Sequence, residues 1–210
     1  MLSSSKHERV RPALGSVDRP PVRRYFLRHD MALRKILTYP ATELKHLAKP
    51  VANIDGTIDQ LATDMVETMY AAPGVGLAAV QVGVPERVVV VDVDHENPGK
   101  HLLKLVTPVI VEREGSIVWE EGCLSVVDFN AEVTRARRVL VRAWTIDQRE
   151  IEVEASELLA VALQHEIDHL DGKLFIDRIS RLKRDLYRRK VKKWIRDGVP
   201  IEARGKEGEI

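Results

Sequence analysis

One short segment, residues 164–170, constrains the fold of this chain more than any other. It reads Gln-His-Glu-Ile-Asp-His-Leu and matches the HExxH pattern. His165 and His169 are four residues apart, so on an α-helix they project from one side and can share a metal ion. Glu166 lies about 100° around the helix from His165, beside such an ion, where a general base for an attacking water belongs. The fold must then surround a metal-binding helix, unless this is an ordinary helix that happens to carry two histidines.

Two histidines do not complete a catalytic metal site, which usually has three protein ligands and an open position. No histidine follows His169, and the acids that follow it lie in a charged helix and tail. The better candidate is Cys123, the only cysteine of the chain, because a thiolate binds late first-row ions strongly. The alternative for a lone cysteine is a small buried apolar residue. A single cysteine also excludes an intramolecular disulfide and suits a reducing compartment.

Start and stop signals predict three helices. Thr57 and Gln60 read as a capping box that begins the first, which ends at Pro73. Its apolar residues recur at helical spacing, as do those of a second helix from Ser156 through His169 and of a third from about Ser180 to Asp197. The predicted strands are Arg87–Val93, Leu102–Val106, Val109–Glu112, Val139–Ile146 and Glu150–Val153, the last two forming a hairpin that turns at Asp147, Gln148 and Arg149.

These elements predict an α+β domain. Mixed or antiparallel sheets surround the central metal-binding helix, with one helix on its N-terminal side and another at the C-terminus. We expect a single catalytic domain over residues 31–200, a flexible extension over 1–30 and a tail over 201–210. The extension is rich in arginine and proline, so it reads either as a targeting segment or as sequence upstream of a natural start at Met31.

Composition and charge exclude several classes of protein. No apolar run approaches the ~18–20 residues of a membrane span, and no secretory signal is recognisable. The formal net charge is +1, which gives no global reason to bind nucleic acid and no sign of sequence-specific recognition. We therefore expect a cytoplasmic protein, monomeric by default, whose electrostatic partners must be met by a local patch.

Three motifs together resemble the peptide deformylase family. Residues 74–81 read Gly-Val-Gly-Leu-Ala-Ala-Val-Gln, similar to the family's GxGLAAxQ. Residues 121–125 read Glu-Gly-Cys-Leu-Ser, similar to EGCLS, and His165–His169 supply the HExxH element. The resemblance covers about residues 33–197. It departs after EGCLS, where many members have a proline and then an arginine, whereas residues 126–130 here read Val-Val-Asp-Phe-Asn; the peptide preference is therefore open.

The resemblance implies a metal-dependent hydrolase that removes the formyl group from the N-terminal formyl-methionine of nascent polypeptides. Cys123, His165 and His169 would hold the metal, and Glu166 would transfer the proton from water to the leaving amine. The Gln81 side-chain amide and the Leu124 backbone N–H would stabilise the developing oxyanion, although Gln81 taken alone reads as a surface polar residue. The implied ion is Fe²⁺ in the cell, with Zn²⁺, Ni²⁺ or Co²⁺ as alternatives in purified protein.

The same resemblance implies a substrate site beside the metal. Val75, Gly76 and Gly122 would contact the peptide through their backbones, as an added strand does. The pocket for the methionine side chain would be walled by Leu158, Val161 and Ala162, which otherwise read as ordinary core. Trp119 is a further candidate for this pocket. Asp168 is a candidate supporting residue, paired with Arg135.

The last predicted helix is strongly basic. Between Arg181 and Arg196 nine lysines and arginines face one acid, Asp185, which reads either as a solvated helix face or as a docking surface for the ribosome. Two other functions stay open at this point. A metalloendopeptidase would share HExxH but needs a downstream third ligand, which this chain lacks. A non-catalytic ribosome-associated metal module would not need Glu166 or Gln81.

Overall fold

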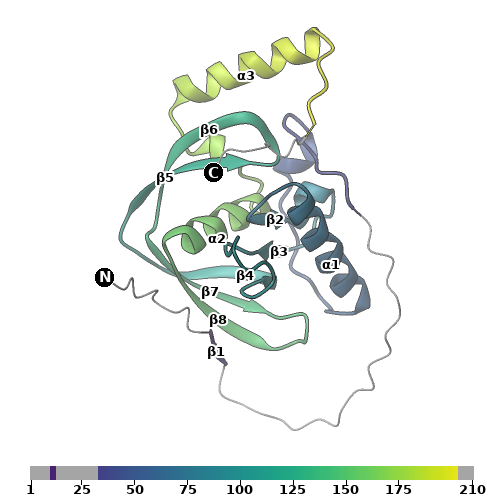
Figure 1. Cartoon of the computed structure of the whole chain (residues 1–210), viewed down its shortest axis with the longest axis vertical. Coiled ribbons are helices and arrows are strands. Elements are labelled where there is room, and N and C mark those ends of the chain that lie inside the picture. Colours follow the sequence, from purple (N-terminus) through teal and green to yellow (C-terminus); the bar gives the residue numbers. More distant parts are fainter. Residues whose placement is uncertain (1–9, 13–32, 203–210) are drawn as a thin grey trace.

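Helix α2 (Glu157–Leu170) lies at the centre of the fold, between two sheets (Figure 1). The computed structural model describes residues 10–12 and 33–202. Below α2 in Figure 1 lies the larger sheet, and above it lies a separate two-stranded hairpin. The predicted α+β class, with antiparallel sheets around a central helix and helices on both sides in sequence, is confirmed.

The larger sheet has six strands in the order β1-β8-β7-β4-β3-β2, and every neighbouring pair is antiparallel. All four residues of β3 are buried, as expected for a β-branched strand covered on both faces. The strand bounds are Val10–Pro12 (β1), Gly76–Ala78 (β2), Val88–Val91 (β3), Leu103–Glu114 (β4), Arg138–Trp144 (β7) and Glu150–Ser156 (β8).

The prediction of two strands separated by Pro108 was wrong, because β4 is continuous. Its pairing with β7 is interrupted between Val106 and Val109. Thr107 there has a positive φ of 50°, and proline, which lacks an N–H, is accepted at such a bulge. The hairpin of β7 and β8 was predicted correctly.

The two-stranded sheet, β5 (Ile117–Cys123) and β6 (Val126–Arg135), was not predicted. Only Leu124 and Ser125 connect its strands, and neither is a usual residue of a tight hairpin turn. The inner face of β6 packs on a small core beneath the last helix, α3 (Arg181–Arg196). This hairpin positions Cys123 above α2.

Helix α1 (Gly56–Ala71) covers the face of the sheet opposite α2, at the β2–β3 end. The predicted capping box was wrong, because Asp55 caps the helix instead. Its carboxylate accepts the backbone N–H of Thr57 at 2.9 Å, since aspartate is a strong N-cap and precedes a glycine free to start the turn. Gln60 donates to Asp64 at 2.6 Å.

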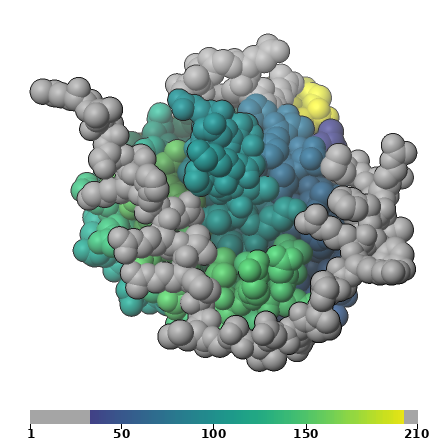
Figure 2. Space-filling model, turned by 60° about the horizontal axis from the view of Figure 1, so that its bottom comes forward, coloured from purple at the N-terminus to yellow at the C-terminus, as the bar shows by residue number. Residues whose placement is uncertain are grey.

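The space-filling view shows the side of the molecule on which α1 lies. The blue surface of α1 and the green surface of the β7–β8 hairpin flank the teal surface of the segment that leads into β4 (Figure 2). Between the large sheet and α2 lies the largest core cluster, which holds Leu163, Ile167 and Leu170 from the helix. Helix α2 is therefore packed against the sheet along one side.

Helix α3 begins after Ser180 and ends before Asp197, as predicted, and it lies outside the hairpin (Figure 1). Its apolar stripe is narrower than expected. Tyr187 and Val191 are buried, but Leu182 and Leu186 are 71% and 55% exposed, because they lie on a part of the helix that the hairpin does not reach.

Most of the predicted extension (1–30) and tail (201–210) lies outside the described residues. Residues 10–12 form β1, which pairs with β8 at the edge of the large sheet. None of the described helices is both long and apolar enough to cross a membrane.

Candidate metal centre

Two elements bring together the three predicted metal ligands. His165 and His169 project from one side of α2, and Cys123 is the last residue of β5. One nitrogen or sulfur atom from each residue lies within 4.8 Å of the others, and Cys123 Sγ is 3.3 Å from His169 Nε2. The ladder between β5 and β6 shifts register between Glu121 and Cys123, and such irregularities re-aim a side chain. The cluster has the Cys/His₂ chemistry that late first-row ions prefer.

Glu121 orients one of the ligands. Its Oε2 lies 2.8 Å from His165 Nδ1, which leaves Nε2 of that ring for a metal. Arg135 holds the same carboxylate with two hydrogen bonds of 2.6 and 2.9 Å. Burial alone would raise the pKa of Glu121, but the hydrogen bonds of Arg135 and His165 outweigh it and lower the pKa to about 2. Glu121 is therefore a carboxylate at every working pH.

Asp168 extends this support to the next segment of the chain. It accepts a hydrogen bond from Arg135, as predicted, and it also pairs with Arg178, which follows the short helix η3 (Phe175–Asp177). Asp168 and Arg135 are both buried, whereas the Arg178 side chain is 38% exposed. Two carboxylates and two guanidinium groups thus connect α2, the hairpin and η3 behind the metal ligands.

Glu166 lies in contact with strand β2. A Cβ atom on Gly76 would come closest to Oε1 of Glu166 and would lie 2.8 Å from its Cδ and Cγ, so only glycine leaves room for this carboxylate. Burial raises the pKa of Glu166 to about 7, Glu121 adds to the rise and His165 opposes it. Oε2 of Glu166 is buried without a hydrogen-bond partner in the described part of the chain. A buried base of this kind fits the handling of a proton from a water or substrate.

Gln81 is held with its amide nitrogen toward the cluster. Its Oε1 accepts the backbone N–H of Ala78 at 2.8 Å, which fixes the orientation of the amide. Its Nε2 donates to Ser125 Oγ at 3.1 Å and lies 3.7 Å from Cys123 Sγ. A fixed N–H donor beside the ligands suits the stabilisation of negative charge that develops on a substrate oxygen.

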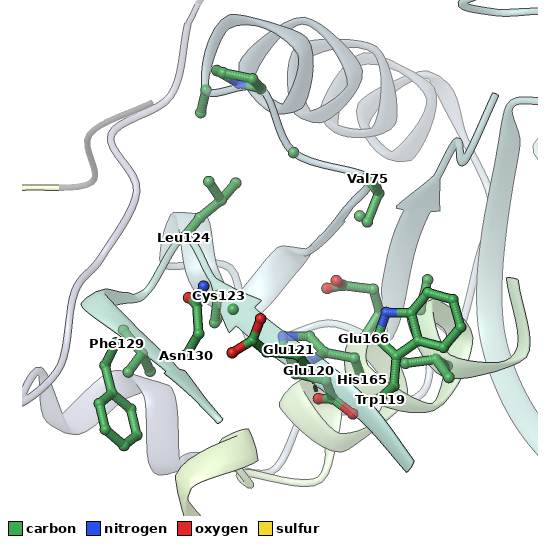
Figure 3. A pocket seen from close by; sticks show the side chains of 18 of the residues that line it. Val75, Trp119, Glu120, Glu121, Cys123, Leu124, Phe129, Asn130, His165 and Glu166 are labelled. Carbon is green, nitrogen blue, oxygen red and sulfur yellow. Dashed lines mark hydrogen bonds and ion pairs between the residues drawn. The ribbon is translucent and has the colours of Figure 1, made fainter. Parts of the chain in front are cut away.

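A cavity of about 590 Å³ opens onto these residues. Its walls come from the segment before β2, from both strands of the hairpin and from α2, and Figure 3 shows Val75 on the side opposite Trp119. His169 lies beneath it, fully buried. The other predicted site residues all line the cavity, namely Val75, Gly76, Gln81, Gly122, Cys123, Leu124, Leu158, Val161, Ala162, His165 and Glu166.

The cluster is suited to a divalent cation. Burial lowers the pKa of His169 well below its usual value, so this imidazole is neutral, the form that binds metals. Burial also acts to lower the pKa of His165, but Cys123 and Glu121 outweigh it and raise that pKa. The surroundings of His165 therefore favour positive charge, and a metal cation supplies that charge as a proton does.

Three residues that support the site, Glu121, Ser125 and Arg178, were not predicted as such from the sequence. Glu121 and Ser125 lie within the EGCLS motif, and a buried arginine such as Arg135 needs a carboxylate partner. That requirement was the available signal for Glu121. For Arg178 the sequence contains no comparable signal. Its partner Asp168 was already paired with Arg135 in the prediction, so no second cation was expected there.

An HExxH helix, a cysteine on a neighbouring strand within reach of both histidines and a buried glutamate define a class of metal-dependent hydrolase. Comparison with known proteins identifies the family. Residues 33–185 match the model of the family described as polypeptide deformylase, so the chain belongs to this family.

Individual relatives support the same family assignment. The chain is 51% identical over 168 residues to a peptide deformylase of Alkalilimnicola ehrlichii, covering 80% of this chain and 94% of the relative. A peptide deformylase of Syntrophobacter fumaroxidans is 48% identical, with 80% and 98% covered. Among solved structures, one from Legionella pneumophila is 44% identical with a TM-score of 0.75, covering 81% of this chain and 99% of the other.

A second solved structure, of the Ehrlichia chaffeensis enzyme in complex with actinonin, is 39% identical with a TM-score of 0.72 over 78% of this chain and 98% of the other. The predicted family and enzyme class are therefore confirmed.

Proposed function

We propose that the three ligands, Glu166 and Gln81 together remove the formyl group from formyl-methionine at the start of nascent polypeptides. The observation that carries this proposal is the convergence of Cys123, His165 and His169 to within 4.8 Å at the base of a cavity that Glu166 and Gln81 also line. A divalent ion held by the three ligands would polarise the formyl oxygen and acidify a water.

The residues of the chain then have distinct tasks. Glu166, whose pKa is raised to about 7, takes the proton of the attacking water and delivers it to the leaving amine nitrogen. The Gln81 amide and the Leu124 backbone N–H donate to the formyl oxygen as negative charge develops on it. The products are formate and a free N-terminal amine.

The substrate lies in the cavity as an extended strand. Val75, Gly76 and Gly122 expose backbone at its edge, which suits hydrogen bonding to a peptide main chain. Leu158, Val161 and Ala162 form an apolar wall beside His165, which suits the methionine side chain.

Formate release from formyl-Met-Ala-Ser tests the reaction, with protein prepared anaerobically in Fe²⁺ or in Ni²⁺. Rapid release is expected from the parent chain, and a loss of at least 100-fold from Glu166→Gln, on the order of general-base catalysis. The glutamine variant keeps the size of the side chain, and its metal content serves as the control. A folded, metal-loaded parent that releases no formate would contradict the proposal.

We further propose Fe²⁺ as the ion in the cell, by resemblance to the family, with Zn²⁺, Ni²⁺ and Co²⁺ as substitutes in purified protein. A thiolate and two imidazoles bind all four ions, so the ligands do not select among them. Elemental analysis of protein purified without oxygen tests this, and so does the loss of activity in air through oxidation of iron and Cys123. An iron-loaded protein that keeps full activity after peroxide treatment would argue for a different ion.

We also propose that α3 docks on the ribosome, where the substrate emerges, and that the chain acts as a monomer in the cytoplasm. Exposed lysines and arginines suit an anionic RNA surface. Because Tyr187 and Val191 are buried, deletion of α3 would disturb the fold, so charge reversal is the sharper test.

Reversal of the exposed residues Lys192, Lys193 and Arg196 to glutamate should abolish salt-sensitive co-sedimentation with ribosomes. Reversal of Arg113 on β4 provides a distant control. Equal co-sedimentation of both variants would contradict docking through α3.

A further inference from the structure

One stretch of the cavity wall is left out of the ladder between β5 and β6. Val126 of β6 pairs with Cys123. The next paired residue of β6 is Ala131, which lies opposite Glu121. The four residues between them, 127–130, therefore face a single residue of β5, and all four line the cavity. A bulge of this kind leaves residues unpaired, so the pairing of the hairpin does not by itself fix the backbone of this wall segment.

Asp128, in the middle of the wall segment, has an uncommon backbone conformation. Its φ is 51°, in the left-handed region that few non-glycine residues occupy. Such a conformation persists where surrounding contacts hold it. Figure 3 shows the ring of the next residue, Phe129, directed away from Cys123 and Glu166, and this ring packs on the small core beneath α3. The contacts that hold the segment are therefore to be found on its outer side.

Helix α3 supplies three contacts to the wall segment from that side. The Tyr187 hydroxyl donates to the backbone oxygen of Val127 at 3.3 Å. Lys190 Nζ donates to the backbone oxygen of Asp128 at 2.9 Å. The ring of Tyr187 stacks on that of Phe129, with the centroids 4.7 Å apart. Two side chains of α3 thus hold two successive carbonyl groups and the aromatic ring that follows them.

The partners in these contacts are themselves fixed. The Lys190 ammonium lies 4.7 Å from the ring centroid of Trp194, a cation–π distance. Phe129 also stacks on Phe175, with the centroids 6.0 Å apart. Phe175 is buried, and its ring lies 6.1 Å from that of His165. The wall segment is therefore held between α3 on one side and the core beside a candidate metal ligand on the other.

We propose that Tyr187 and Lys190 are positioning residues for deformylation, which from α3 hold residues 127–129 in the conformation that admits the substrate. This inference rests on the proposed deformylation and gives α3 a role in the reaction itself. Neither side chain lines the cavity, so both act through its wall and leave proton transfer by Glu166 unchanged. When only a fraction of the protein is competent to bind, the apparent affinity falls by that fraction. Loss of these contacts should therefore raise KM and leave kcat unchanged.

The test uses the metal-loaded full chain and formyl-Met-Ala-Ser. Lys190→Met removes the ammonium donor and keeps an apolar side chain over Trp194, and it should raise KM about fivefold, the effect of one lost hydrogen bond. Tyr187→Phe keeps the ring on Phe129 and removes the hydroxyl, so KM should rise about threefold. In both variants kcat and metal content should equal those of the parent. Lys183→Met, an equal change of charge at an exposed position of the same helix, is the matched control and should leave KM unchanged.

Two further measurements separate positioning from a general loss of stability. Glycine adopts the left-handed conformation without a steric cost, so Lys190→Met/Asp128→Gly should return KM to within about twofold of the parent. The affinity for the product peptide Met-Ala-Ser, measured by calorimetry, does not depend on turnover. It should weaken in Lys190→Met by the same factor by which KM rises.

An unchanged KM in both Lys190→Met and Tyr187→Phe would overturn the inference. A fall in kcat or in metal content at constant KM would also overturn it, because the contacts would then support the fold or the metal centre and not the wall. An equal rise of KM in Lys183→Met would assign the effect to the charge of α3, and failure of the glycine variant to recover KM would show that the conformation of Asp128 is not what Lys190 holds. No formate from the folded, metal-loaded parent would contradict deformylation itself.

Discussion

The contact between Gly76 and Glu166 provides the sharpest test of the site, through the substitution Gly76→Ala. The added methyl carbon would come closest to Oε1 of Glu166 and would lie 2.8 Å from both its Cγ and Cδ. Carbon atoms in good contact are about 3.5–4.0 Å apart, so the glutamate must move by about 1 Å. The backbone of Gly76 is paired with Val91 in the sheet, and it therefore resists displacement more than the side chain does.

The expected effects follow from that displacement. Misplacement of a reacting group by about 1 Å costs on the order of 100-fold in rate, so kcat/KM for formyl-Met-Ala-Ser should fall by about that factor. An extra methyl group in a packed site costs about 1–3 kcal/mol of unfolding free energy. The three atoms nearest to the new methyl group all belong to Glu166, so the metal content should stay equal to that of the parent.

Formate release, elemental analysis and urea denaturation measure the three quantities. Gly56→Ala is the matched control, because no atom lies within 4 Å of its added Cβ. A second variant, Gly76→Ala/Glu166→Asp, shortens the obstructed side chain and should recover stability without activity. A folded, metal-loaded Gly76→Ala protein with kcat/KM within threefold of the parent would refute the reasoning. Failure of the shorter side chain to recover stability would mean that the clash lies elsewhere.

Three further predictions concern stability. Arg135→Ala should lower the unfolding free energy measured in urea by about 3–5 kcal/mol, because it leaves buried carboxylates unpaired. Arg178→Ala removes a side chain that is 38% exposed and should lower the unfolding free energy by only about 1 kcal/mol. Equal losses in the two variants would contradict this ranking. Removal of the metal by a chelator should lower the melting temperature by about 10 °C relative to ion at 1,000 times its Kd, and an unchanged value would argue against a tight site. Burial and the hydrogen bond to Asp92 raise the pKa of Tyr70 to about 12, so the stability that its neutral form provides is complete below pH 10 and lost as the pH rises towards 12. Phenolate absorbance should show this ionisation near pH 12 in the parent and not in Tyr70→Phe, and equal absorbance changes in both proteins would contradict the assignment.

The central helix and the pair His165 and His169 could be predicted from local geometry, whereas Cys123 was predicted from its chemistry and from the family resemblance. The four-residue spacing of His165 and His169 places both side chains on the same face of a helix. The β-branched run around β3 likewise predicted a strand buried on both faces. Non-local placement was different: that Cys123 approaches His169 follows from a hairpin, and spacing along the chain does not encode it.

The hairpin itself was missed for identifiable reasons. Its turn at Leu124 and Ser125 lacks the glycine or asparagine that marks a tight connection. Along β5, Glu120 and Glu121 are adjacent in sequence although only the second is buried, so no clean alternation of apolar and polar residues appears. The burial of Glu121 is made possible by Arg135, a partner fourteen residues away. Pairwise compensation of this kind overrides the local polarity of a residue.

Recruitment of the third candidate ligand, Cys123, from a strand makes the metal centre depend on the register of that strand. Glu121 and Cys123 both reach α2, because Glu121 Oε2 lies 2.8 Å from His165 Nδ1 and Cys123 Sγ lies 3.3 Å from His169 Nε2. A slip of one residue in this strand would remove the thiolate ligand and the partner of His165 together. The register of β5 therefore fixes one candidate ligand and the partner of another at the same time. A ligand supplied by a later turn of α2 would depend on the helix alone, whereas this candidate metal centre depends on the pairing of the β5–β6 hairpin as well.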